Sequence, residues 1–485
     1  MEKLQKRIDR IKEILGHSNE LIIKEIDVQP RIAILYMLGL NDTTALSKFV
    51  ISPIQSSKES KLNIDMLKDS IITLSEMIVE TDENKIIDSL LKGKGVLLLD
   101  GEKNSLILAT DKYKERSVEE PPTSAVLKGP RSGFVENLKT NLSILRKILA
   151  TPKLRTISTT VGKHTSTSIT IVYIDGIAEQ KVVETVKKRI DSINIDGVID
   201  SHYIAGFLEE KPNSIFKQIG DSEKPDIVAA KMLEGRVAII VDGSPLVLTV
   251  PFIYLEDFQS GDDYYGDHAR ATFLRWLRIA SIFITILTPA LYIAVVLHHY
   301  KAIPLKFLIT IINTTKGLPL TPFAEILFVL ILFEILYEAS LRMPKYLGLA
   351  LSIVGALILG DTAVKAGLIS PPAVMIVAVS GLSIYCIPDQ AAQLNILRLL
   401  FTLAGGMLGF FGVTITLLFV ILYLNDFDSY GSPYFAPLAP FINSDIKDFI
   451  YKTDIVNMKY RPRSIAGNRK NQRRQGGSNG KDNIR

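Results

Sequence analysis

Long uncharged runs in the second half of the chain constrain its fold more than any other feature. Residues 279–297 carry no charged side chain, and their length is close to the ~20 residues that a helix needs to cross about 30 Å of hydrocarbon. Residues 346–360, 366–388 and 399–424 are also uncharged. Residues 1–270, in contrast, mix charged and apolar residues as soluble domains do. The chain is therefore predicted to join a soluble region to a helical bundle in a membrane.

Strand and helix patterns alternate through the soluble region. Strands are predicted for RIAILYMLGL (31–40) and for both halves of GVLLLDGEKNSLILATD (95–111), with a helix over 63–80 between them. The same kinds of pattern return in SITIVYIDGI, KVVETVKKRIDSI and RVAIIVDGSPLVLTVP. We predict an α/β cytosolic region of two small subdomains, followed by an all-α polytopic transmembrane bundle of four to six membrane segments.

The predicted divisions follow these changes of pattern. They are an amphipathic helical segment at 1–30, α/β subdomain 1 at 31–115, a linker at 116–132, α/β subdomain 2 at 133–270, the transmembrane domain at 271–426 and a basic, partly disordered cytosolic tail at 427–485.

Charge distribution predicts the orientation. The N-terminus has no apolar signal region, so the soluble part should stay in the cytosol. From Lys452 onward the tail contains ten Lys or Arg against two Asp, which favours the cytosolic side as well. Two cytosolic ends require an even number of crossings. We expect four, at 273–297, 346–370, 371–388 and 394–424, with 322–344 re-entrant or interfacial.

Segment 322–344 is apolar but carries four charged residues. At 100° per residue Glu334, Glu338 and Arg342 share one stripe, and Glu325 lies roughly opposite. Charges at membrane depth are costly and should face protein, water or the interface. This polar seam has two interpretations, a gating role or the packing of subunits. Asp361 and Lys365 belong to it as well, and their i, i+4 spacing allows them to neutralise each other.

The other residues that could form a functional site are better interpreted as structural. The glycines of LAGGMLGFFG are more typical of close helix packing than of a pore hinge: Gly405, Gly406, Gly409 and Gly412. Cys386 is the single cysteine, so a disulfide framework is excluded. His298 and His299 point about 100° apart on a helix and make a poor metal site. No GxSxG, HExxH or GxGxxG motif is present, and we expect no enzyme, no cofactor, no metal and no nucleic-acid partner.

Several separated motifs resemble the A subunit of GerA-family spore germination receptors. They are KGPRSGFVENLKTN (128–141), EKPD (223–226), LEGRVAIIVDGSP (233–245), DDYYGD (262–267), LGLALSIVGALILGDTAVKAGLISP (347–371) and the series Glu334, Glu338, Arg342 and Pro344. The similarity extends from about residue 31 to about residue 441. Within these motifs we expect structural roles for Gly129, Pro130, Arg131, Gly235, Arg236, Asp242, Gly243 and Pro245.

The resemblance implies a multi-pass protein of the bacterial inner membrane, in spores, that acts with B and C subunits. It implies that the A subunits form a homo-oligomer in the lipid bilayer, a nutrient-gated channel that releases monovalent cations. Two other functions stay open from the residues alone: a scaffold that transmits the signal without conducting, and a small-solute transporter. A transporter predicts inverted repeats, and residues 271–424 show none.

Overall fold

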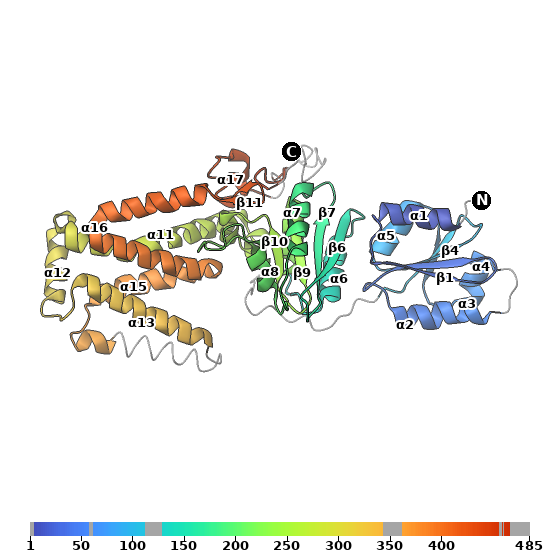
Figure 1. Cartoon of the computed structure of the whole chain (residues 1–485), viewed down its shortest axis with the longest axis horizontal. Coiled ribbons are helices and arrows are strands. Elements are labelled where there is room, and N and C mark those ends of the chain that lie inside the picture. Colours follow the sequence, from blue (N-terminus) through green and yellow to red (C-terminus); the bar gives the residue numbers. More distant parts are fainter. Residues whose placement is uncertain are drawn as a thin grey trace, which may run out of the picture.

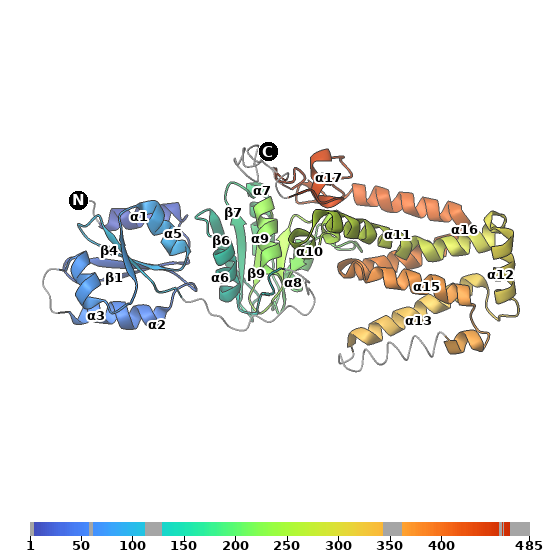
Figure 2. The same ribbon diagram turned by 180° about the vertical axis from the view of Figure 1, so that it is seen from behind.

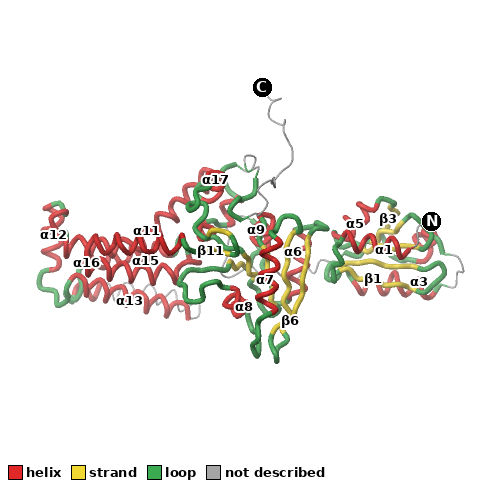
Figure 3. The backbone as a smooth tube through the Cα atoms, turned by 45° about the horizontal axis from the view of Figure 1, so that its top comes forward, coloured by secondary structure: helices red, strands yellow, loops and turns green. Residues whose placement is uncertain are grey.

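The computed structural model describes residues 4–57, 62–111, 129–342, 361–454, 458 and 460–465. Three parts follow one another along the long axis: a first α/β unit, a second α/β unit and a helical bundle (Figure 1). The view from behind shows the same succession (Figure 2). Apart from the short pair β11 and β12, the strands of the described residues lie in the two α/β units (Figure 3).

The first unit is a five-stranded antiparallel sheet covered on both faces. Its strands are β1 (Leu21–Ile26), β2 (Ile32–Met37), β3 (Met77–Glu80), β4 (Gly95–Leu99) and β5 (Ser105–Leu108), in the spatial order β1-β2-β4-β5-β3. α1 (Leu4–Ile14) and α5 (Glu83–Leu91) bury their apolar stripes on one face. The other face is covered by short helical segments: α2 (Thr43–Ala45), η1 (Leu46–Ile51), α3 (Ser52–Ser56), α4 (Ile64–Met66) and η2 (Leu67–Ile71).

The second unit repeats this topology. Its strands are β6 (Leu154–Val161), β7 (Thr167–Ile174), β8 (Gly220–Ser222), β9 (Val237–Val241) and β10 (Val247–Val250), in the order β6-β7-β9-β10-β8. In both units the order is therefore first, second, fourth, fifth, third. α6 (Leu138–Ile148) and α9 (Pro225–Glu234) cover one face, while α7 (Gln180–Asp191) and α8 (Ser201–Leu208) cover the other.

One hydrogen bond recurs at the same place in both units. Each fourth and fifth strand is joined through an Asp-Gly pair, whose glycine has a positive φ: Gly101 at +82° and Gly243 at +90°. The aspartate accepts from the first backbone N–H of the unit's first helix: Leu4 N to Asp100 Oδ1, and Leu138 N to Asp242 Oδ1, both at 3.0 Å. A helix leaves its first N–H groups unsatisfied, and this carboxylate satisfies one of them in each unit.

The bundle consists of helices that run between two ends. α11 (His268–His298) starts at the near end, beside the second unit, and reaches the far end, where α12 (Leu305–Thr315) lies across the bundle (Figure 1). α13 (Pro322–Arg342) returns toward the near end, as does α15 (Pro371–Ile384). Segment 322–344, expected to be re-entrant or interfacial, therefore contains a helix of 21 residues, about 30 Å long, which is close to the thickness of the hydrocarbon core of a bilayer. Residues 346–360 of the expected second crossing lie outside the described residues.

α16 (Ala391–Asn425) is a helical hairpin. Gly409 has φ +61° and ψ −145°, which interrupts the helix and separates two arms, 391–408 and 410–425. Both ends of α16 lie at the second unit: Gln390 donates to the carbonyl of Tyr254, and the rings of Tyr423 and Phe216 are 5.8 Å apart. The prediction of one crossing at 394–424 is wrong in this respect, because the chain turns back at Gly409.

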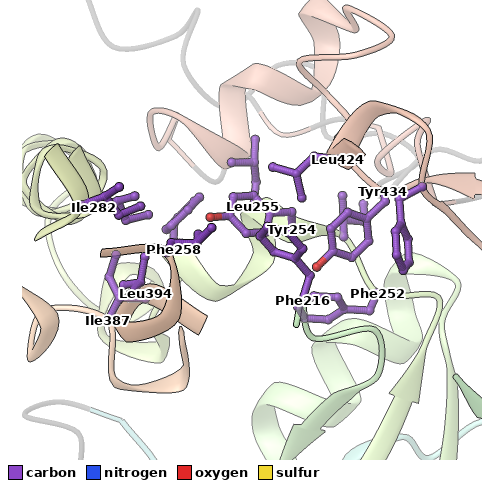
Figure 4. Close-up of a cluster of buried hydrophobic side chains, with 14 of the residues drawn as sticks. Phe216, Phe252, Tyr254, Leu255, Phe258, Ile282, Ile387, Leu394, Leu424 and Tyr434 are labelled. Carbon is purple, nitrogen blue, oxygen red and sulfur yellow. The ribbon is translucent and has the colours of Figure 1, made fainter. Parts of the chain in front are cut away.

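The second unit and the bundle share one hydrophobic core (Figure 4). Phe216, Phe252 and the η3 segment (Tyr254–Phe258) meet Ile282 of α11 and Leu394 of α16. By comparison, the first unit joins the second through a buried ion pair, with Arg146 Nη2 2.9 Å from Glu20 Oε1.

Three segments differ from the sequence-based expectation. The helix expected over 63–80 ends at Ile71, and 77–80 is the edge strand β3. Segment 1–30 contains strand β1 after α1, so it forms part of the first unit. The start of the expected tail is folded as β11 (Asp428–Ser429), β12 (Ser432–Pro433) and α17 (Asn443–Phe449), because Tyr434 and Phe449 are buried in the shared core.

Candidate functional site

An ion pair in the bundle joins α13 to the first arm of α16. Glu334 Oε2 lies 3.3 Å from Arg398 Nη2, and Glu334 Oε1 accepts from Asn395 Nδ2 at 2.9 Å. The Arg398 side chain is 5% exposed and that of Glu334 is 48% exposed. The guanidinium therefore lies inside the bundle, and its countercharge lies at the edge.

Arg398 is not fully satisfied by this pair. Its Nη1 and the Asn395 Oδ1 are buried without a hydrogen-bond partner among the described residues. Gly381 of α15 lies against this nitrogen, since a Cβ there would be 3.9 Å from it. A buried donor left unpaired costs about 1–3 kcal/mol, and more when it is charged. Three helices thus meet at a polar contact whose hydrogen-bonding groups are only partly satisfied by the described residues.

Two further pairs of the predicted seam are local and exposed. Arg342 Nη2 lies 2.5 Å from Glu338 Oε1, and Lys365 Nζ lies 2.5 Å from Asp361 Oδ2. All four side chains are more than half exposed. The Asp361–Lys365 pair is the one that the i, i+4 spacing allows. Neither pair contacts Glu334 or Arg398 in the described structure.

Glu325 is the most buried acid of the seam. It is 1% exposed in the first turn of α13, and its Oε1 accepts from the backbone N–H of Ser370, which caps α15. Its Oε2 and the hydroxyl of Tyr292 are buried without a hydrogen-bond partner among the described residues. The amino ends of two helices meet at this carboxylate, and helix amino ends favour negative charge. The six charged residues grouped in the predicted polar seam thus form four separate sites.

The four glycines of α16 have different surroundings. A Cβ on Gly405 would lie 2.6 Å from the carbonyl oxygen of Ala290 in α11, and one on Gly406 would overlap the ring of Phe323. A Cβ on Gly412 would overlap the carbonyl of Ala404 in the other arm. These three glycines stand where backbones or rings approach closely. Gly409 forms the reversal itself.

A charged cluster that the sequence analysis did not single out lies between the second unit and the start of α16. Asp257 is buried between Lys217, whose Nζ is 4.0 Å away, and Gln390, whose Nε2 is 3.4 Å away. Burial raises the pKa of Asp257 to about 7, although Lys217 opposes that shift. Burial alone would lower the pKa of Lys217, but the carboxylates of Asp257 and Asp221 outweigh it, and the pKa ends above its usual range.

A second missed cluster fixes the start of α11. Asp263 of α10 (Gly261–Tyr265) accepts from Arg275 Nε at 2.8 Å and from both terminal nitrogens of Arg278 at 2.9 Å. Burial would raise the pKa of Asp263, but these hydrogen bonds outweigh it and leave the pKa below its ordinary value. Lys452 donates to the carbonyl of Asp263 and ties the C-terminal segment to the same point. The sequence does contain a signal for this cluster. Arg275 and Arg278, three residues apart, come directly before an apolar run, and the acidic Asp263 precedes them.

The family-motif residues lie in the second unit or beside it. Gly129, at φ +121°, packs against the ring of Tyr265, and Gly235, at φ +114°, ends α9. Arg236 is buried and bonded to Glu234 and to Glu256, whose Oε2 is 2.8 Å away. Asp242 and Gly243 form the hairpin described above. Pro130, Arg131 and Pro245 lie in the connecting loops.

The described residues contain no group of three or more His, Cys, Asp or Glu side chains that could hold a metal ion. His298 Nε2 lies 2.9 Å from the carbonyl oxygen of Gly406, and His299 stacks on Phe410. Both histidines therefore pack against the α16 reversal.

Two helical segments of the described structure, 268–298 and 388–425, are long and apolar enough to cross a membrane. Only 22% of the most apolar window in the second is buried. A core helix of a soluble protein would be mostly buried, so this exposed apolar surface favours contact with lipid or with another protein.

Comparisons with known proteins agree on one family. Residues 9–464 match the family described as Bacillus/Clostridium GerA spore germination protein. Spore germination protein KA of Bacillus subtilis (strain 168) is 34% identical over 471 residues, which cover 96% of this chain and 87% of that protein. The uncharacterized membrane protein YfkQ of the same strain is 36% identical over 393 residues, or 81% of this chain and 77% of that protein.

A solved structure matches about half of the chain. The crystal structure of the N-terminal domain of the A subunit of the Bacillus megaterium spore germinant receptor GerK3 is 28% identical, with a TM-score of 0.39. The match covers 52% of this chain and 96% of that one.

Proposed function

This chain belongs to the GerA family of spore germination proteins, and from that premise we propose that it is the A subunit of a germinant receptor. In this proposal it lies in the inner spore membrane, with its α/β units and its C-terminal tail in the cytosol. It acts with B and C subunits and transmits a signal without catalysing a reaction. Several A subunits form a nutrient-gated channel for monovalent cations.

The observation that carries the channel proposal is the buried Arg398. Ionisable residues inside a membrane bundle are expensive and are functional candidates by default. Arg398 is held by one half-exposed carboxylate, and its Nη1 has no partner among the described residues. A small shift of α16 past α13 would break this contact and expose the charge to a water-filled path.

The contacts between α16 and the second unit support the proposal that a signal passes from the second unit to the bundle. The arm that carries Arg398 begins directly after Gln390, which bonds to Tyr254 and Asp257 of the second unit. The same arm contributes Leu394 and Leu397 to the shared core. A rearrangement of the second unit would therefore move the arm directly. Nutrient binding on a partner subunit can favour the open arrangement only by its differential affinity for the two arrangements.

Spores that carry a Glu334→Ala receptor test this proposal. Glu338→Ala is the matched control, because Glu338 lies one turn further along α13 in an exposed pair that does not touch Arg398. We expect cation release, after addition of candidate amino acids or sugars, to change in rate or in nutrient dependence for Glu334→Ala and to stay normal for Glu338→Ala. Immunoblots must show normal amounts of the A, B and C subunits in both strains.

If cation release falls only in strains whose immunoblots show loss of the receptor subunits, the Glu334–Arg398 pair serves packing. That result would favour a scaffold subunit that conducts nothing. Equal effects of both substitutions at normal abundance would also count against a gating role for Arg398.

A further inference from the structure

One helix of the bundle has almost no partner within the described structure. Of the 11 residues of α12, all of them described, Ile311 is the one that is buried. Leu305, Ile309 and Ile312 are 70%, 48% and 52% exposed. An apolar helix left this bare in water would be unfavourable, so something other than the described residues covers it.

The faces of α12 point in three directions. At 100° per residue, Leu305, Ile309 and Ile312 form one apolar arc, and Lys306, Thr310 and Asn313 form a polar arc, roughly a third of a turn away. Ile311 lies about a third of a turn from both arcs and faces the bundle. The exposed Phe307 lies between the polar arc and Ile311. Apart from this residue, the helix has one side for the bundle, one apolar side and one polar side. Such a division is typical of a helix that lies in a membrane interface.

The charged residues around α12 indicate what covers its apolar side. Residues 301–324 contain Lys301, Lys306 and Lys316, all exposed, and no Asp or Glu. In the described segments that reach the far end, the acids are Asp361, which Lys365 pairs, and the buried Glu325. A second copy of the chain thus offers these lysines little complementary charge there. Anionic phospholipids offer negatively charged headgroups for the lysines and acyl chains for the apolar side of the helix.

We infer that α12 is an interfacial helix, lying in the leaflet at the far end of the bundle and binding anionic phospholipid through Lys301, Lys306 and Lys316. This inference rests on the proposed membrane placement of the bundle. It gives the far end of the bundle an anchor among the lipid headgroups.

Tryptophan quenching by brominated lipids tests the inference on the full chain, which contains a single tryptophan, Trp276. In a Trp276→Phe background, Leu305→Trp reports the apolar arc and Thr310→Trp is the matched control on the polar arc. Both proteins are reconstituted in vesicles of phosphatidylcholine and phosphatidylglycerol brominated near the top of the acyl chains. We expect about twofold stronger quenching of Leu305→Trp, because an interfacial helix buries its apolar face about 5–10 Å below the headgroup boundary.

The unmodified chain separates failure of this inference from failure of its premise. Trp276 is 56% exposed at the near end of α11 and should be quenched in the same vesicles if the bundle spans them. Quenching of Trp276 without quenching of Leu305→Trp would mean that protein, and not lipid, covers the apolar arc of α12, and the inference would fall. Absence of quenching at both positions would overturn the membrane placement itself.

The anionic preference has its own readout. Quenching of Leu305→Trp should rise with the fraction of phosphatidylglycerol, and Lys306→Gln together with Lys316→Gln should remove that rise. Quenching that is strong but independent of both phosphatidylglycerol and the lysines would overturn the anionic part of the inference.

Discussion

At the scale of single residues, Arg398 depends on a carboxylate that belongs to another helix. Removing one partner of a buried pair is worse than removing the charge itself, because the remaining ion stays buried without compensation. We therefore expect Glu334→Ala to lower the free energy of unfolding by about 1–3 kcal/mol. Arg398→Met, which keeps the apolar stem and removes the charge, should cost less. Thermal unfolding of both variants in detergent checks the order, and the reverse order would contradict this view of the pair.

Gly409 is a residue on which the hairpin of α16 depends. Its φ of +61° with ψ −145° is a conformation that only glycine adopts readily, and a Cβ would lie 3.0 Å from His298. Gly409→Ala should cost about 1–3 kcal/mol of stability and increase proteolysis of the bundle. Gly381→Ala is the control, since a Cβ there meets ordinary contact distances on a helical backbone. Equal stability of the two variants would show that the reversal does not need a glycine.

Asp257 should make stability depend on pH. Its pKa of about 7 in the folded chain lies above the roughly 3.9 of an unfolded aspartate, so the folded form holds the proton between these values. Asp257 therefore makes its full contribution to the free energy of unfolding below about pH 4. This contribution falls as the pH rises, by up to about 1.4 kcal/mol per pH unit, until pH 7. Asp221, Glu256, Lys217 and Asp389 face the same cluster.

Unfolding of wild type and Asp257→Asn across pH 4–8 measures this contribution. The asparagine variant should lose part of the decline between pH 4 and 7 and keep whatever slope other groups produce. Identical slopes would mean that Asp257 is ionised in the folded chain throughout that range.

At the scale of elements, the two Asp-Gly hairpins should contribute alike. Asp100→Ala and Asp242→Ala each remove the acceptor for the first N–H of a helix, which costs about 0.5–2 kcal/mol. Asp→Asn at either position keeps a side-chain oxygen that can accept and should cost less. Calorimetric unfolding of the four variants tests this, and an Asn variant as unstable as its Ala counterpart would show that the hydrogen bond is not the cause.

Features that depend only on residues close together in the sequence could be predicted from it. The two Asp-Gly hairpins follow from turn chemistry, and the Asp361–Lys365 pair follows from helix spacing. Strand β3 could not be predicted, because edge residues 77–80 carry little alternation and continue a helical pattern. The length of α16 favours a hairpin, since its 35 helical residues exceed the ~20 that one crossing needs.

At the scale of the whole molecule, the family could be predicted from the sequence, and the comparisons confirm it. The position of the functional candidates could not. Glu334 and Arg398 are 64 residues apart, and their contact depends on how three helices pack. Asp257 and Gln390 are likewise brought together by the shared core. Such long-range contacts are set by burial of apolar surface, which a local pattern does not encode.

The reversal at Gly409 also bears on how the chain is made. Arg398 is the one charged residue in the stretch 391–425. If the bundle lies in the membrane as proposed, a ribosome-bound chain could therefore release both arms of α16 from the translocation channel as a pair, with no hydrophilic loop to carry across the lipid. Biosynthesis of this part would need neither a separate stop signal nor a second start signal, and the hairpin would enter from the side where both of its ends remain.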